Sequence, residues 1–240
     1  MTGMEAGERV RKAAFNITAA FEGAGYGTYQ NFDEGIVSYG RFQFTLASGN
    51  LEAVLERYLE VASGETAEGL RGYLGRVRGR EEGLRHDGEF KRLLKEAAEE
   101  GAMREAQDGV ATERFWKLVQ GLSIQPRNVQ TALGQALIFD MAINHGPRHD
   151  MIGLAEEGLE VKPKSRIPEN GITEAALIER VAKVRQERMH RLADKHGWEG
   201  LRQRGDFWVA LVEREDWDLQ GDAEGLLEVK PGRKVQVRHP

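Results

Sequence analysis

The sequence predicts a mainly α-helical fold of the α+β class, with a small β element near the N-terminus. Apolar residues recur at three- and four-residue spacing over residues 5–22, which is typical of an amphipathic helix. Residues 23–44 break this period with glycines and tyrosines and alternate loosely in their second half, which indicates one or two short strands. The segment 125–144 is the most apolar part of the chain and ends at His145-Gly146-Pro147, as a buried helix would.

Capping residues and breaks by glycine or proline predict the other helices. Residues 47–50 form a capping signal before a helix over residues 51–62. Glycines divide the charged segment 65–101 into short helices with a solvated face. A long helix is predicted over residues 102–121, and the apolar helix is predicted to begin at Gln125-Pro126.

The C-terminal third is predicted to be helical and then loosely folded. Pro163 and Pro168 bracket a loop before a helix from Thr173 to about His196, and the residues after Leu227 are strand-like or loose. The aromatic residues of this region are predicted to pack between the C-terminal helices; they are Trp198, Phe207, Trp208 and Trp217.

The composition of the 240-residue chain excludes several classes of function. The net charge of −5 argues against a nucleic-acid-binding protein and gives only weak support to binding of a polycation. The absence of cysteine excludes disulfides, thiol nucleophiles and Cys-based metal sites, and the histidines lack metal-ligand spacing. No glycine motif for a nucleotide follows a strand, and no apolar run could span a membrane. We therefore expect no cofactor, no metal and no nucleic-acid or membrane partner.

Two carboxylates in and beside the glycine-rich segment are candidates for an acid/base pair. Glu22 stands at the end of the first helix beside Phe21, where partial desolvation favours a protonated carboxyl group. Asp33 lies in a polar turn, where it is expected to stay ionised. Glycoside hydrolysis uses such a pair, one acid to protonate the leaving oxygen and one carboxylate to activate water. The alternative is that Glu22 is a surface acid and Asp33 a turn former.

The residues around this pair favour a sugar-binding site. Ser38, five residues after Asp33, is placed to hold a water against that carboxylate. Glycines allow the backbone to approach a ligand closely, and tyrosines offer flat faces and hydroxyls to sugars. The glycines are Gly23, Gly25, Gly27, Gly35 and Gly40, and the tyrosines are Tyr26, Tyr29 and Tyr39.

The order of a helix-closing Glu, a hairpin Asp and a hydroxyl residue resembles the catalytic arrangement of the lysozyme superfamily. Residues 102–116 (AMREAQDGVATERFW) and 131–147 (TALGQALIFDMAINHGP) resemble the corresponding helices of the family 46 chitosanases. Residues 39–58 (YGRFQFTLASGNLEAVLERY) are similar to the segment that follows the catalytic Asp of that family.

The resemblance extends over about residues 10–225 and implies a lysozyme-like, two-lobed fold. It implies one catalytic domain over residues 1–240, with a small β-hairpin in the minor lobe and a long central helix. The cleft is then formed by about residues 20–50 and by the central helix, about residues 127–145.

The resemblance also implies roles for individual residues. Glu22 takes the position of the general acid and Asp33 that of the general base, and Ser38 stands where the family has a water-positioning Thr. Asp140 and Arg185 match members of a buried carboxylate–guanidinium network that supports the catalytic Glu. Arg202 and Arg204 are both candidates for a second Arg of that network.

Departures from the family concern the substrate. Asn50 and Lys183 stand where the chitosanases carry acids that bind the ammonium groups of the substrate, and this exchange removes attraction for a polycation. We assign both residues to substrate binding, together with the tyrosines and Arg41, Gln43 and His145. For His145 the alternative is a residue that caps the helix or forms the cleft wall.

The leading hypothesis from the sequence is a monomeric, endo-acting muramidase that cleaves β-1,4 bonds of peptidoglycan with inversion. One alternative is a chitosanase that cleaves β-1,4 glucosamine bonds, and another is a non-catalytic module that binds the cell wall. The N-terminus has no apolar signal segment. We therefore expect synthesis in the cytoplasm and action on the cell wall, reached by phage-type release, as for an endolysin, or by another export route.

Overall fold

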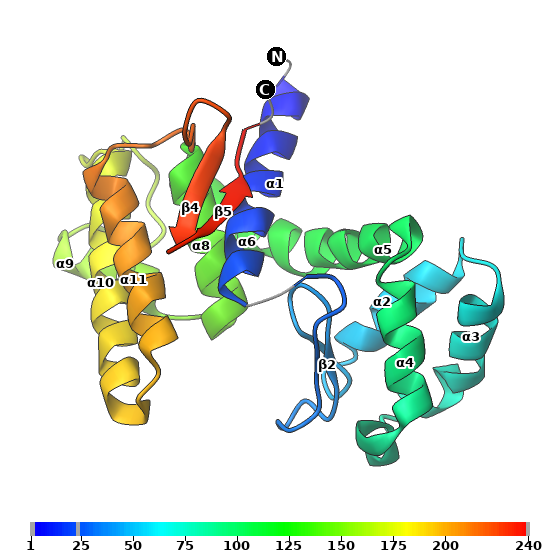
Figure 1. Ribbon diagram of the computed structural model, residues 1–240. Coiled ribbons are helices and arrows are strands. Elements are labelled where there is room, and N and C mark those ends of the chain that lie inside the picture. Colours follow the sequence, from blue (N-terminus) through cyan, green and yellow to red (C-terminus); the bar gives the residue numbers. More distant parts are fainter. Residues whose placement is uncertain (1–2, 23–24, 239–240) are drawn as a thin grey trace. The chain divides into compact units, whose positions relative to one another are not determined.

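The computed structural model describes residues 3–22 and 25–238, with side chains from residue 7 onward, so the predicted cleft residue Gly23 lies outside it. The chain forms two compact units, a terminal unit (Met1–Phe21 and Phe115–Pro240) and a middle unit (Glu22–Arg114). Both are mainly helical and each has a small antiparallel sheet, which confirms the predicted fold class (Figure 1). None of the described helices is long and apolar enough to cross a membrane.

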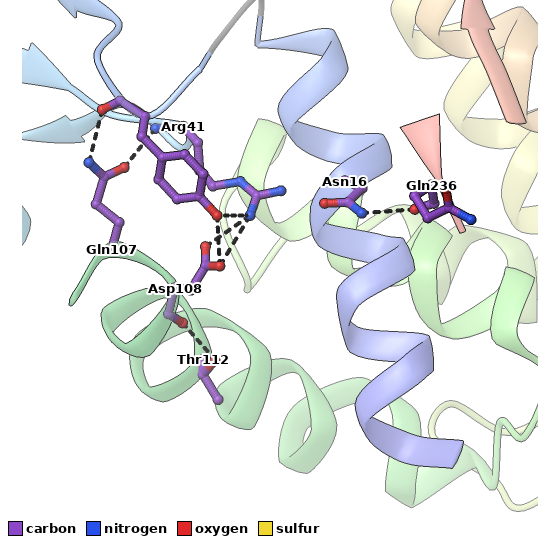
Figure 2. Close-up of polar contacts among 7 residues, drawn as sticks. Asn16, Arg41, Gln107, Asp108, Thr112 and Gln236 are labelled. Carbon is purple, nitrogen blue, oxygen red and sulfur yellow. Dashed lines mark hydrogen bonds and ion pairs between the residues drawn. The ribbon is translucent and has the colours of Figure 1, made fainter. Parts of the chain in front are cut away.

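The terminal unit is a group of helices with one β-hairpin. Helix α10 packs against α9 and α11, and α1 packs against α8 and the hairpin (Figure 1). The elements are α1 (Gly3–Phe21), α6 (Lys117–Val119), η3 (Gln120–Ile124), α7 (Gln125–Arg127), α8 (Ala132–His145), α9 (Met151–Gly158), α10 (Glu174–His196), α11 (Glu199–Glu213), β4 (Leu226–Lys230) and β5 (Arg233–Gln236). The segment after Leu227 is thus an ordered hairpin, and the side chain of Asn16 on α1 donates to the Gln236 carbonyl at 2.8 Å (Figure 2).

Helix α8 lies in the core of the terminal unit because it is apolar on nearly all of its faces. The ring of Phe15 on α1 stacks on that of Phe139, with centroids 4.9 Å apart. The predicted start of this helix at Gln125-Pro126 is wrong. Asn128 adopts a left-handed conformation that ends α7, and α8 begins after Thr131, whose hydroxyl accepts a hydrogen bond from the Gly134 amide at 3.1 Å.

The boundaries of α10 follow the sequence signals. The Thr173 hydroxyl accepts a hydrogen bond from the Ala176 amide at 3.1 Å, which caps the first turn. Gly197 ends the helix with a φ of 71°, in the left-handed region that favours glycine. The prediction of a helix from Thr173 to about His196 is therefore confirmed.

The middle unit joins a short sheet to a set of helices. Its sheet has three antiparallel strands in the order β1-β2-β3, whereas the sequence predicted one or two strands. The predicted helix over residues 102–121 is interrupted, because α5 ends at Ala111 and π-helical turns follow. The elements are β1 (Tyr29–Gln30), β2 (Ser38–Tyr39), β3 (Phe44–Thr45), α2 (Asn50–Leu59), α3 (Glu65–Arg78), η1 (Glu82–His86), α4 (Gly88–Ala97) and α5 (Gly101–Ala111), followed by the connecting turn η2 (Thr112–Trp116).

The side chain of Gln107 on α5 forms hydrogen bonds with the backbone of two loops of the sheet. Its Oε1 accepts a hydrogen bond from the Arg41 amide at 3.0 Å, and its Nε2 donates to the Tyr26 carbonyl at 2.9 Å (Figure 2). Gly40 has a φ of 82°, and a Cβ at that position would lie 2.3 Å from Gln107 Oε1. Only glycine therefore satisfies both the conformation and the close approach.

We predict that Gly40→Ala lowers the free energy of unfolding by at least about 2 kcal/mol, because it combines a left-handed alanine with loss of buried hydrogen bonds. Gly72→Ala, in α3 with open space around its Cβ, is expected to raise it by about 0.5–1 kcal/mol. Urea denaturation of both variants checks this. Equal effects of the two substitutions would contradict the proposed role of Gly40.

Candidate active site

Asp33 lies in the turn between β1 and β2 and is exposed. The buried hydroxyl of Ser38 donates to its carboxylate, with Oγ 3.2 Å from Oδ2 and 3.4 Å from Oδ1. The Gly35 amide donates to Oδ1 at 2.9 Å. A Cβ on Gly35 would come within 2.9 Å of both the Asp33 carboxylate and the Ser38 hydroxyl, so this turn requires glycine there. The structure thus brings Asp33 and Ser38 together, as their spacing predicts.

The backbone of this turn is strained next to Asp33. Ile36 has a φ of 67°, a conformation that β-branched residues rarely adopt. Its amide donates to the Asp33 carbonyl, and the Val37 amide donates to the Gly35 carbonyl at 2.8 Å. Strain of this kind persists only where surrounding contacts fix the conformation, so the orientation of the Asp33 carboxylate is set before any substrate binds.

Glu22 is half-buried and directly follows the last residue of α1. That residue, Phe21, is held from three sides within the terminal unit. Its ring packs edge-to-face on Phe207 with centroids 5.2 Å apart, and the Arg204 guanidinium lies 5.2 Å from its centroid. The Lys230 ammonium donates to the Phe21 carbonyl at 3.2 Å. The end of α1, from which Glu22 extends, is therefore fixed.

Asp140 is fully buried and is the centre of a charged network. Its carboxylate accepts hydrogen bonds from Arg185, from Arg204 at 2.6 and 3.1 Å, and from the Trp208 indole at 3.0 Å. Burial alone would raise the pKa of Asp140, but the two guanidiniums outweigh it and hold the pKa well below its usual range. Arg204 is thus the second Arg partner that the sequence left open, because Arg202 pairs with surface acids instead.

Tyr26 and Arg41 belong to an internal network of the middle unit. The Arg41 guanidinium donates to the Tyr26 hydroxyl at 2.8 Å and to Asp108 Oδ1 at 3.0 Å (Figure 2). The Tyr26 hydroxyl in turn donates to Asp108 Oδ2 at 2.9 Å. From the sequence no role was assigned to Asp108 or Gln107, because polar residues are common along this helix and nothing in the pattern marks these two. Both residues hold the loops that carry the predicted site.

The prediction that Tyr39 contacts sugar is wrong. Tyr39 is completely buried, and its hydroxyl donates to the Leu94 carbonyl at 2.6 Å. Burial raises the pKa of this hydroxyl, and the ring is part of the packing of the middle unit. Tyr29 is half-buried, with the Lys91 ammonium 5.2 Å from its ring centroid, so one face of this ring is occupied by a cation.

Gln43 and Asn50 lie in the segment that follows β2. Gln43 has a φ of 50°, and its side-chain amide donates to the Gly40 carbonyl at 3.1 Å. The Asn50 side-chain oxygen accepts a hydrogen bond from the Arg114 guanidinium at 2.8 Å, and the same group donates to the Gly49 carbonyl at 3.1 Å. A cation therefore lies directly beside Asn50.

The other two predicted substrate-binding residues belong to the terminal unit. His145 is half-buried at the end of α8, where burial and then the Arg185 charge lower its pKa to about 4, so it is neutral at pH 7. Lys183 is exposed on α10 and donates to Glu179 at 2.6 Å. Within residues 3–22 and 25–238, no group of three or more His, Cys, Asp or Glu side chains is arranged to hold a metal ion.

The family to which this chain belongs follows from its similarity to known sequences. The sequence model of glycosyl hydrolase family 46 matches residues 14–221, which is most of the chain. The chain belongs to glycosyl hydrolase family 46. It is therefore a glycosidase, and its helical units with small sheets are the lysozyme-like fold of that family. No curated protein sequence matches it significantly.

Several solved chitosanases have structures similar to that of this family 46 chain. The native chitosanase from Bacillus subtilis MY002 has a TM-score of 0.71 and 21% identity, and the match covers 94% of this chain and 97% of that one. The GH46 chitosanase from Gynuella sunshinyii, in complex with chitotetraose, has a TM-score of 0.73 and 21% identity, with 98% of each chain covered. A mutant of the Bacillus enzyme was solved with 6 GlcN, at a TM-score of 0.70 and 21% identity, with 96% of this chain and 98% of that one covered.

We predict that Asp140→Asn lowers the free energy of unfolding by about 3–5 kcal/mol, because it leaves two buried guanidiniums without a counter-charge. Asp194→Asn removes one of the two acids that pair with Arg202 at the surface and is expected to cost at most about 1 kcal/mol. Chemical denaturation at pH 7 measures both changes. Comparable losses for the two variants would show that the Asp140 network does not hold the terminal unit together.

Stability is predicted to fall as the pH falls from about 6.5 to about 4. Burial lowers the pKa of both His145 and His149 to about 4, whereas unfolded histidine titrates near pH 6.5. Between these values the unfolded chain binds more protons than the folded chain, so acid favours unfolding. The lowered pKa of Asp140 affects stability only below about pH 4.

The variant His145→Asn/His149→Asn removes both groups and is expected to flatten this pH dependence. Denaturant unfolding at pH 7, 5.5 and 4.5 provides the measurement. If the free energy of unfolding of the double variant still falls between pH 6.5 and 4 as steeply as that of the wild type, other groups cause the acid sensitivity.

Proposed function

We propose that this family 46 glycosidase is an endo-acting chitosanase that hydrolyses β-1,4 bonds between glucosamine units with inversion. The observation that carries this proposal is the fixed, exposed carboxylate of Asp33, held by Ser38 and Gly35 in a chain of this family. The similar solved chitosanases, two of them with chitosan oligosaccharides, support the choice of substrate. The net charge of −5 agrees with a cationic polymer as ligand.

In the proposed reaction, Asp33 takes a proton from a water molecule while the water oxygen attacks C1 of the sugar. Glu22 gives its proton to the leaving O4 of the neighbouring unit, so that charge and atoms balance. Ser38 donates to Asp33 from inside the turn, which orients the carboxylate and leaves its outer lone pairs for the water. Phe21 and its contacts hold the helix end from which Glu22 extends.

Peptidoglycan is a second candidate substrate, favoured by the surroundings of Asn50. The guanidinium of Arg114 bonds to the Asn50 side chain, so this position presents a cation where a chitosan-binding site would use an acid. Lys183 adds a second positive side chain at a predicted substrate position. Both features suit a polymer with acetylated amino groups and peptide carboxylates better than a fully cationic one.

We predict that the purified protein releases reducing ends from chitosan and that the rate rises as the degree of acetylation falls. Glu22→Gln and Asp33→Asn are each expected to lower kcat by about 10²–10⁴-fold, the usual contribution of one general acid or base. Glu65→Gln, which neutralises an exposed acid at the start of α3 in the same unit, is the matched control and should keep most of the activity.

Peptidoglycan is tested in parallel with the same variants. A rate on peptidoglycan that exceeds the rate on every chitosan, and that is lost in Glu22→Gln, would replace the chitosanase proposal by the muramidase one. Tight binding of either polymer without turnover by the native protein would contradict both assignments.

A further inference from the structure

Phe32 is an exposed aromatic residue directly before the proposed general base. Its side chain is 80% exposed, the highest value among the large apolar side chains in the part of the chain that the structure describes. Burying such a ring is ordinarily a large stabilising contribution, and at this position the fold gains little of it. A polar residue would serve the turn equally well, so the ring is not explained by folding.

The backbone on both sides of Phe32 is held in place. The Asn31 side chain donates to the Arg85 carbonyl at 2.8 Å, and the Arg85 guanidinium donates back to the Asn31 carbonyl at 2.7 Å. On the other side, Asp33 is fixed by Ser38 and the Gly35 amide. The ring of Phe32 is therefore presented to solvent from a preorganised segment, which lowers the entropy lost on binding a ligand.

The charges around the ring suit a cationic sugar. Phe32 is followed by two exposed carboxylates, Asp33 and Glu34, and preceded by Asn31, whose carbonyl accepts from the Arg85 guanidinium. Two acids and one cation therefore adjoin Phe32, and the net negative charge favours an ammonium group there. The face of an aromatic ring itself attracts cations and packs against the apolar C–H face of a sugar. A flat apolar surface beside two acids is complementary to a β-linked glucosamine chain.

We propose that Phe32 is the aromatic platform of a sugar subsite adjacent to the bond that Asp33 helps to cleave. This inference rests on the proposed function, because it takes an amino-sugar polymer as the ligand. Phe32 contacts the sugar next to the reacting one and contributes to substrate binding. It does not take part in proton transfer, which remains with the two carboxylates.

The test compares Phe32→Ala, Phe32→Trp and Val61→Ala with the wild type on soluble chitosan oligosaccharides. Phe32→Ala is expected to raise KM about tenfold, the effect of losing one aromatic contact, with kcat little changed. Phe32→Trp retains a flat face and is expected to restore KM. Val61 is 73% exposed in the same unit and serves as the control for removal of an exposed apolar side chain, with no expected change.

Two further readouts separate the platform from a structural role. The pH profile of kcat/KM should be unchanged in Phe32→Ala, because Asp33 keeps its partners. In the Glu22→Gln background, titration with the same oligosaccharides should show the same tenfold loss of affinity on adding Phe32→Ala. A lower kcat with a shifted pH profile would mean that Phe32 acts through Asp33 and would overturn the platform.

The outcomes for this inference and for the proposed function are distinguishable. Unchanged KM and affinity in Phe32→Ala, with normal chitosan hydrolysis by the wild type, would overturn the platform and leave the function intact. Absence of hydrolysis by the wild type would contradict the function. In that case, an oligosaccharide affinity that falls in Phe32→Ala and recovers in Phe32→Trp would still support the subsite.

Discussion

The buried carboxylate of Asp140 is the interaction on which the terminal unit depends. It is completely enclosed, and it joins α8, α10 and α11 through Arg185, Arg204 and Trp208. Such a charge is tolerated in the interior only because two guanidiniums and an indole satisfy it. Arg204 also lies over the ring of Phe21, so the same network fixes the end of α1 and the point from which Glu22 extends.

The middle unit fixes Asp33 by a different and purely local device. Ser38 and Gly35 hold the carboxylate, and the strained backbone at Ile36 shows that the turn conformation is imposed by its contacts. Gln107 fastens the surrounding loops from α5. The proposed acid and the proposed base are thus positioned by independent sets of interactions, one built on charge burial and the other on turn geometry.

Helix ends and contacts within one hairpin were predictable from the sequence, because neighbouring residues determine them. The burial of individual side chains was not, because it depends on packing between distant segments. Helix α10 begins after Thr173 and ends at Gly197, as predicted, because helix caps act through residues that are adjacent in sequence. Asp33 and Ser38 contact each other, as predicted, because a hairpin brings together residues that are five apart. The burial of Tyr39 depends on Leu94, more than fifty residues away, and so was not predictable from its segment. Arg202 and Arg204 look alike in sequence, but only Arg204 lies on the buried side of α11.

In the proposed mechanism, Glu22 and Asp33 act as an inverting acid/base pair on a β-1,4-linked amino-sugar polymer. Proton NMR of the first products formed from chitosan oligosaccharides, recorded before mutarotation, measures the stereochemistry of this reaction. We expect the new reducing end to appear as the α-anomer, since water activated by Asp33 attacks the face opposite the leaving group. Initial appearance of the β-anomer would contradict it, because retention requires a covalent intermediate on a carboxylate close to the sugar carbon.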